Sequence, residues 1–203
     1  MSNLENKEGS SLHKIIEIPF LGIDHKELTE WILSPKGRVI INRDEWVDLH
    51  IQYNIFQQPL QQFYEIFRHV RNSFFNNLSE LGATTLMQYY IHGWCNILEK
   101  SDQIDWHSHC DFYKKNIFHG IYCVDPAGTS YTEYRLPKSK EVFETVDSHQ
   151  GCGHFISDMI TEHRTSKNLS ESPRITIAFD IIDFEHYCKT RDTRVGNQFI
   201  PLL

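Results

Sequence analysis

The chain has 203 residues, a formal net charge of −7 and 40% hydrophobic residues. This length suits a single domain, 1–203, with one sizeable core, and the acidic balance argues against nucleic acid as a partner, because phosphate binding needs clustered positive charge. No apolar run approaches the roughly 20 residues that cross a bilayer, and the start lacks the basic and apolar regions of a signal peptide, so we expect a cytoplasmic protein with no membrane partner.

The first part of the chain predicts short elements of both kinds. Residues 1–12 are polar and are expected to be mobile. Residues 15–23 are predicted to form a strand, and residues 25–33 a short helix that stops at Ser34-Pro35-Lys36-Gly37. A second strand is expected near residues 38–42.

The clearest helix runs from Pro59 to Gly82. Proline suits the first helical position and glycine suits the stop. The apolar residues recur every three or four positions and therefore share one face; they are Leu60, Phe63, Phe67, Val70, Phe74, Leu78 and Leu81. A stripe of this kind is typical of core packing rather than of a cofactor site, so we expect it to lie against the outer apolar face of a barrel.

From residue 86 onward the pattern changes to short strands separated by turn signals. The expected strands are 86–98, 116–124, 131–136, 142–146, 154–159 and 174–182. Helices followed by roughly eight strands predict a mainly β protein with flanking α-helices, namely a double-stranded β-helix (a cupin-like jelly roll) supported by N-terminal helices. Residues 86–182 would form the β core. The tail, 184–203, has no clear period and would either cover the barrel or serve a partner.

A histidine and a carboxylate near the middle of the chain indicate a metal site. His109 and Asp111 are two residues apart in an extended segment, so their side chains point the same way, and His163 can join them from a later strand. Such a set binds Fe(II) on one face and leaves the opposite positions open, which a closed structural zinc site does not do. His107 is the alternative first-strand ligand, because alternation places it on the same face. We favour Asp111, since a carboxylate lowers the net charge of the site.

The strand expected at 174–182 has one apolar and one polar face. Arg174, Thr176, Ala178 and Asp180 alternate with isoleucine and phenylalanine, so they share the polar face. A polar face of this kind is expected on a strand that lines the inside of a ligand-binding barrel. Arg174 can bind a carboxylate through a two-pronged, charge-assisted contact, with the Thr176 hydroxyl beside it. By contrast, His92 and His119 lie on expected core strands, where a buried, hydrogen-bonded histidine is commoner than a ligand.

These segments resemble the Fe(II)/2-oxoglutarate-dependent oxygenases (dioxygenases) over residues 86–182. The matching motifs are His109-Cys110-Asp111, the later His163, and Arg174-Ile175-Thr176 on the next strand, in the family's order and approximate spacing. One departure is Ser157-Asp158, where many relatives have an aromatic-Pro pair before the distal histidine.

The resemblance implies a site and its cofactors. His109, Asp111 and His163 would hold Fe(II), and 2-oxoglutarate and O₂ would be the cosubstrates. The far carboxylate of 2-oxoglutarate would lie on Arg174 and Thr176, and Asn96 and Tyr122 would touch the cosubstrate from strands that flank the metal.

The resemblance also implies a reaction. Family members that transfer halide lack the carboxylate ligand, so Asp111 favours hydroxylation of an unactivated C–H bond, with desaturation or ring chemistry as variants. The substrate would be a small molecule or an amino-acid-like or peptide-like compound. Three other functions stay open at this point: a cupin-like metalloenzyme that does not use 2-oxoglutarate, a non-catalytic jelly-roll binding module, and a zinc hydrolase.

Overall fold

The computed structural model describes residues 15–19, 22–41, 53–109, 117–157, 160–193 and 198–203. The segment 1–12 that the sequence predicts to be mobile lies outside these residues. The helices are α1 (His25–Leu33), α2 (Pro35–Ile41), the 3-10 turn η1 (Ile55–Gln57), α3 (Gln61–Asn76), α4 (Leu78–Leu81) and α5 (Phe184–Thr190). The strands are β1 (Ile15–Pro19), β2 (Tyr89–Leu98), β3 (Ile117–Asp125), β4 (Tyr131–Arg135), β5 (Val142–Asp147), β6 (Cys152–Ile156), β7 (Glu162–Thr165), β8 (Arg174–Asp183) and β9 (Ile200–Pro201).

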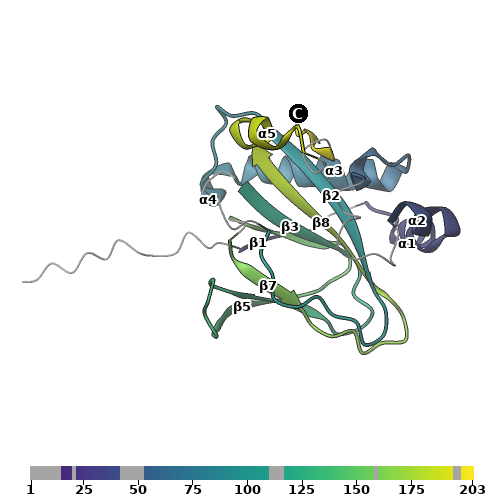
Figure 1. Ribbon diagram of the computed structural model, residues 1–203. Helices are drawn as coiled ribbons and strands as arrows, with labels where there is room; N and C mark the ends of the chain where they lie inside the picture. The colour runs from purple at the N-terminus through teal and green to yellow at the C-terminus, as the bar shows by residue number, and fades with distance from the viewer. Residues whose placement is uncertain (1–14, 20–21, 42–52, 110–116, 158–159, 194–197) are drawn as a thin grey trace, which may run out of the picture.

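Two antiparallel sheets face each other, as Figure 1 shows. The larger sheet has six strands in the order β1-β6-β3-β8-β2-β9, and the smaller has three in the order β5-β4-β7. His107 adds an isolated antiparallel bridge to His163 of β7, so the chain just before residue 109 runs along the free edge of the smaller sheet. The mainly β architecture with flanking helices agrees with the sequence-based expectation.

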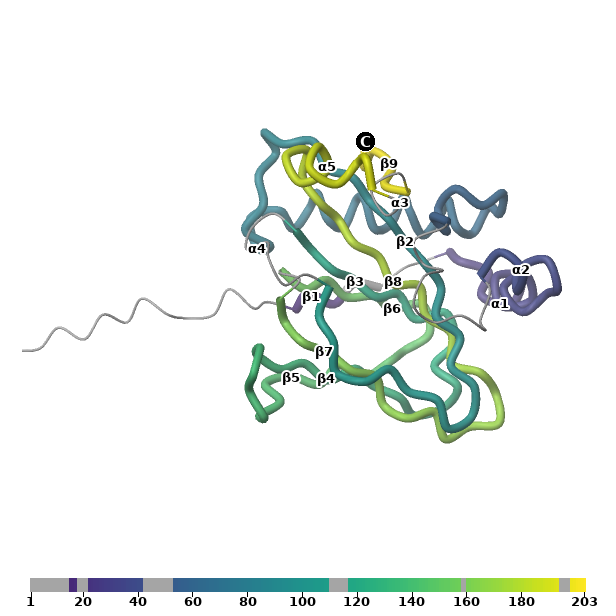
Figure 2. Tube along the Cα trace, in the orientation of Figure 1, coloured from purple at the N-terminus to yellow at the C-terminus, as the bar shows by residue number. Residues whose placement is uncertain are grey.

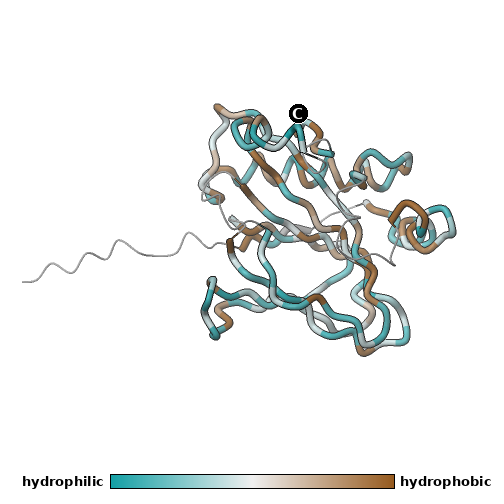
Figure 3. Tube along the Cα trace, in the orientation of Figure 1, coloured by the Kyte–Doolittle hydropathy of each residue, from teal (hydrophilic) through white to brown (hydrophobic). Residues whose placement is uncertain are grey.

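Strand β8 shows how the sequence separates the two layers. Its apolar face carries Ile175, Ile177, Phe179 and Ile181, all at most 1% exposed, and packs in one core with α3. Figure 2 shows α3 crossing the larger sheet on the side away from the smaller sheet. The opposite face of β8 therefore points between the sheets, because successive side chains of a strand alternate. In Figure 3 the β4–β5 hairpin is largely hydrophilic, in keeping with the exposure of most of β5.

The apolar stripe of the long helix is core packing, as predicted. Most of its residues are buried, and Phe74 makes edge contacts with Tyr89 of β2 and Phe118 of β3 at ring-centroid distances of 4.9 and 5.1 Å. The single helix expected from 59 to 82 is divided, because the backbone of Asn77 leaves the helical region between α3 and α4. Gly82 ends α4 with a left-handed φ of 71°, which glycine adopts without strain.

The strand expected at 38–42 is wrong, because Pro35–Ile41 forms helix α2. Proline at the first position starts a helix as readily as it ends the preceding one, and here it does both. Gly37 allows α2 to lie close to α1: a Cβ atom at this position would lie 2.2 Å from the carbonyl oxygen of Trp31. The apolar residues of α2 therefore belong to a helix pair and not to a sheet.

The tail covers one end of the larger sheet. Helix α5 follows β8 directly, and Tyr187 stacks on Tyr90 of β2 at 3.9 Å between ring centroids. Strand β9 then pairs with the edge of β2 at Tyr90 and Ile91. Among the described residues, no helix combines the length and the apolar character that crossing a membrane requires.

Candidate metal centre

The register of the larger sheet brings polar residues from separate strands into the space between the sheets. Asp180 of β8 lies directly opposite His119 of β3, and Thr176 of β8 lies opposite Asn96 of β2. Residues directly opposite each other in antiparallel strands share a face, so these side chains share the polar face of β8. His163 of β7 faces them from the smaller sheet.

Four imidazole rings meet in this space. The ring centroids of His107 and His163 are 4.2 Å apart, and those of His109 and His119 are 3.9 Å apart. His163 lies 4.8 Å from His119 and 5.1 Å from His109. Two sets of possible ligand atoms result, each with its atoms within 4.8 Å of one another: His107, His109 and His163, and His109, His119 and Asp180.

Three nitrogens of this cluster are buried without a hydrogen-bond partner among the described residues. They are Nε2 of His109, Nε2 of His119 and Nδ1 of His163. Buried polar atoms in folded proteins almost always have a partner, so three such atoms in one cluster call for an explanation. A divalent metal ion would supply it, and imidazole nitrogen is a donor that suits iron. The residues present therefore fit a metal ion.

The surroundings of the cluster favour the neutral form of His163, His119 and His107. Burial, and then the neighbouring imidazoles of His119 and His109, hold the pKa of His163 well below its usual value. Burial, followed by repulsion from His109, lowers the pKa of His119 to about 4. Burial and then His109 also lower the pKa of His107. Neutral imidazole is the form that binds metals, so these side chains are ready to act as ligands at neutral pH.

Asp180 is the described carboxylate of the cluster. Burial raises its pKa, but attraction to His109 and hydrogen bonds from His109 and His119 outweigh burial and leave the pKa well below its usual range. Asp180 therefore stays ionised. Its position on the face of Arg174 was visible in the alternation of β8, but that pattern did not distinguish it from a solvated carboxylate. His119, whose place on a core strand predicts only a buried histidine, is likewise part of the cluster.

The structure brings together His107, His109 and His163 from the predicted site. Asp111 lies outside the described residues, so the choice between Asp111 and His107 as the third ligand remains a prediction. The main-chain bridge between His107 and His163, with N–O distances of 3.1 and 2.9 Å, fixes their side chains on one face.

Arg174 is a buried cation surrounded by uncharged acceptors. Its side chain is 1% exposed and donates to the Tyr131 carbonyl at 3.2 Å, to Thr132 Oγ1 at 3.4 Å and to Ser148 Oγ at 2.9 Å. Its Nε has no partner, and in the described part of the chain no carboxylate forms an ion pair with it. Burying an unpaired guanidinium is costly, so an anion that enters this space would be bound strongly.

The remaining predicted residues lie on different faces. Asn96 Nδ2 donates to Thr176 Oγ1 at 3.4 Å, so both line the space near Arg174. Tyr122 lies on the other face of β3, opposite Ile177, and its hydroxyl contacts His25 Nε2 at 2.6 Å. The structure therefore does not bring Tyr122 into the cluster.

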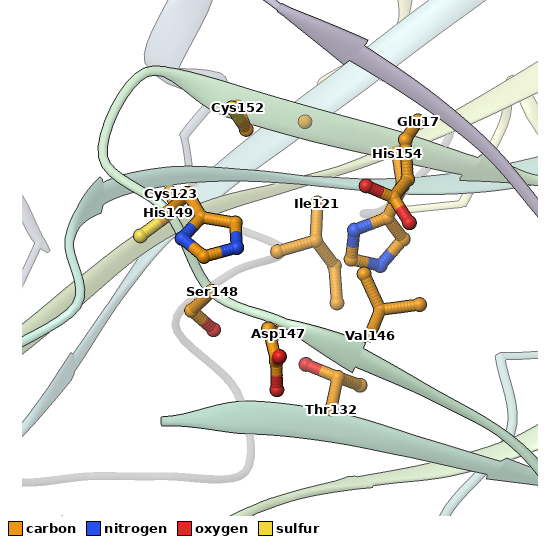
Figure 4. Close-up of a pocket in the computed structure, with 11 residues that line it drawn as sticks. Glu17, Ile121, Cys123, Thr132, Val146, Asp147, Ser148, His149, Cys152 and His154 are labelled. Carbon is orange, nitrogen blue, oxygen red and sulfur yellow. The ribbon is translucent and has the colours of Figure 1, made fainter. Parts of the chain in front are cut away.

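A small pocket opens beside Arg174, between β3, β6 and the β4–β5 hairpin, and Figure 4 shows its lining. Thr132 and Ser148 line the pocket, and both also accept hydrogen bonds from Arg174. Tyr134 is fully buried near this region, with its ring 5.8 Å from that of His163 and its hydroxyl bonded to His154.

Comparison with known proteins identifies the fold. No protein-family model matches the chain, and no curated protein matches its sequence. Among solved structures, a Trichoplax adhaerens prolyl hydroxylase in complex with a hypoxia inducible factor peptide fragment aligns with a TM-score of 0.59 at 12% identity, over 87% of this chain and 86% of that one.

Two enzymes of nogalamycin biosynthesis, both non-haem and α-ketoglutarate-dependent, also align. The carbocyclase SnoK gives a TM-score of 0.58 at 13% identity, over 84% of this chain and 80% of that one. The epimerase SnoN, in complex with Fe³⁺, α-ketoglutarate and nogalamycin RO, gives 0.53 at 11% identity, over 84% and 79%. The chain therefore has the fold of the non-haem iron/2-oxoglutarate-dependent oxygenases, as the sequence resemblance predicted.

Proposed function

We propose that the protein is a non-haem Fe(II)- and 2-oxoglutarate-dependent dioxygenase, and that its two sheets form a double-stranded β-helix. The observation that carries the proposal is the occurrence, in one space between the sheets, of three buried imidazole nitrogens and a buried Arg174 that find no partner and no anion among the described residues. The first calls for a metal ion and the second for a carboxylate. One ligand that binds a metal at one end and carries a carboxylate at the other satisfies both.

The metal ligands in this proposal are His109, His163 and Asp111, with His107 as the alternative to Asp111. When bound, Fe(II) would couple the oxidative decarboxylation of 2-oxoglutarate by O₂ to the oxidation of a substrate C–H bond. Burial keeps the pKa of His163 well below its usual value, so its lone pair is available to the metal without the loss of a proton.

Arg174 would hold the far carboxylate of 2-oxoglutarate. Its three uncharged acceptors fix the guanidinium plane without neutralising it, so the charge remains available to a ligand. The Thr176 hydroxyl, oriented by Asn96, lies two residues further along the same strand face. Burial excludes water from the contact and strengthens it.

The proposed reaction is hydroxylation of an unactivated C–H bond in a small-molecule, amino-acid-like or peptide-like substrate. The related folds include a prolyl hydroxylase with a bound peptide fragment and enzymes of nogalamycin biosynthesis, so the same scaffold serves substrates of both kinds. Trp94, whose ring lies 5.5 Å from that of His109, offers an apolar surface beside the metal position.

The test is an anaerobic titration of 2-oxoglutarate into the Fe(II)-loaded protein, followed by the visible metal-to-ligand charge-transfer absorption. We expect the band in the wild type. Arg174→Ala should need at least about thirtyfold more 2-oxoglutarate, since loss of a buried charge-assisted contact costs about 2–5 kcal/mol. Arg174→Lys should recover part of the affinity, because an ammonium does not reproduce the guanidinium fork. Arg38→Ala, which removes a partly exposed arginine paired with Glu99, is the control.

Absence of the charge-transfer band in the wild type would refute the proposed function. It would favour a cupin-like metalloenzyme that does not use 2-oxoglutarate, for which the close approach of His107, His109 and His163 is the supporting observation. Equal titrations for Arg174→Ala and Arg38→Ala would remove Arg174 from the cosubstrate site.

A further inference from the structure

One carboxylate lies between two imidazoles of the metal centre. Asp180 Oδ1 contacts His119 Nδ1 at 2.8 Å, and Asp180 Oδ2 contacts His109 Nδ1 at 3.3 Å. The side chains are nearly buried, at 14% exposure for Asp180, 12% for His109 and 1% for His119. Asp180 and His119 are directly opposite each other on β8 and β3, so the sheet itself fixes their separation.

The chemistry of this arrangement sets the protonation of both rings. An ionised carboxylate only accepts hydrogen bonds, so both imidazoles must donate from Nδ1. A neutral imidazole carries one N–H, so Nε2 of each ring is then a lone pair. These two atoms, His109 Nε2 and His119 Nε2, are among the buried nitrogens that have no partner in the described structure.

We infer that Asp180 is a positioning residue of the metal centre. It holds His109 in the orientation and tautomer that present Nε2 to the metal, and His119 keeps the carboxylate in place by occupying its other oxygen. The inference rests on the proposed metal site, but it adds residues from β8 and β3 that the ligand motif does not contain. Carboxylates that accept from the second nitrogen of a ligand histidine raise metal affinity by roughly 10–100-fold in other metal sites.

A second Asp–His pair on the same strand provides a matched control. Asp183 is 1% exposed and contacts His186 Nδ1 at 2.6 Å. It also accepts from the His186 backbone N–H at the start of α5. This pair caps a helix and includes none of the clustered imidazoles. Asp183→Asn therefore removes a buried charge from an Asp–His pair without touching the metal centre.

The first experiment needs no metal. Proton–nitrogen correlation spectra of metal-free protein with isotope-labelled histidine report which ring nitrogen carries the proton, with His109→Gln and His119→Gln as assignment variants. We expect Nδ1–H tautomers for both rings in the wild type. In Asp180→Asn at least one ring should change to Nε2–H, because the two rings contact different carboxylate oxygens and the amide replaces one of these with an NH₂ group, which donates and does not accept. An Nε2–H proton on His109 in the wild type would overturn the inference.

The second experiment measures anaerobic Fe(II) affinity by competition with a chelator. Asp180→Asn should weaken binding roughly 10–100-fold, and Asp183→Asn should leave it unchanged within about twofold. Wild-type affinity in Asp180→Asn would overturn the inference and leave the proposed function intact. Failure of the wild type to bind Fe(II) would instead overturn the proposed function.

His119 has its own outcome in the same assay. If His119→Gln abolished binding as completely as His163→Ala while Asp180→Asn had no effect, His119 would be a ligand and the positioning role would be wrong. Should Asp180→Asn fail to fold, the wild-type tautomers alone decide the inference.

Discussion

Replacement of His154 should change how the stability of the protein depends on pH. His154 is 8% exposed, and its Nε2 bonds the hydroxyl of buried Tyr134. Burial, and then electrostatic repulsion of the protonated ring by His119 and Arg174, lowers the pKa of His154 from 6.5 to about 3. Above the unfolded pKa, near 6.5, the ring is neutral in both states. As the pH falls below that value only the unfolded chain takes the proton, so the folded state loses stability until the pH reaches about 3.

The size of this effect follows from the shift. A difference of about 3.5 pKa units corresponds to about 5 kcal/mol in total, of which about 2 kcal/mol is lost between pH 7 and pH 5. The assay is urea unfolding of metal-free protein at both pH values for the wild type and His154→Gln. The glutamine cannot titrate, so the difference in free energy of unfolding between the wild type and His154→Gln should decrease by about 2 kcal/mol at the lower pH. If this difference in free energy of unfolding were the same at both pH values, the prediction would be wrong. His149→Gln, with an exposed ring, controls for the substitution itself.

Three further predictions concern the fold and the metal. Gly37→Ala should lower the free energy of unfolding by about 1–3 kcal/mol, because the added Cβ meets main-chain oxygens of α1 that cannot move aside. Gly82→Asn should lower it by less than about 1 kcal/mol, since asparagine tolerates the left-handed backbone at the end of α4. Equal losses for the two variants in urea unfolding would contradict this prediction. Fe(II) at about a hundred times its Kd should stabilise the wild type by about 3 kcal/mol in anaerobic thermal unfolding, and it should hardly stabilise His163→Ala. If His163→Ala kept the stabilisation, His163 would not be a metal ligand. In Fe(II) titrations, Asp111→Ala should lose binding and His107→Ala should keep it; the reverse result would make His107 the third ligand.

The strands and the long helix could be predicted from the sequence because their patterns are local. Alternation along β8 assigns Ile175 and Phe179 to the core and Arg174 to the opposite face, and the structure agrees. Helix α2 could not be predicted in the same way. The apolar run after Gly37 fits a strand or a helix equally well, and the close approach of α2 to α1 at Gly37 cannot be seen in that pattern.

The same difference between local patterns and tertiary contacts applies to the residues of the candidate site. His109 and His163 could be found because their spacing with Asp111 and Arg174 is a sequence motif. His119 and Asp180 could not, since their meeting depends on the register between β3 and β8, which a single sequence does not reveal. Tyr122 shows the opposite failure: it lies on the expected strand, but its hydroxyl points to His25 on the outer face.

The most direct test of the central claim is a crystal structure of the protein grown anaerobically with a redox-inactive divalent metal and 2-oxoglutarate. We expect the metal on His109 and His163, with Asp111 or His107 completing the set, and the far carboxylate of 2-oxoglutarate on the guanidinium of Arg174. A metal bound away from His163, or a cosubstrate that leaves Arg174 without an anion, would contradict the proposal that this protein is a 2-oxoglutarate-dependent dioxygenase.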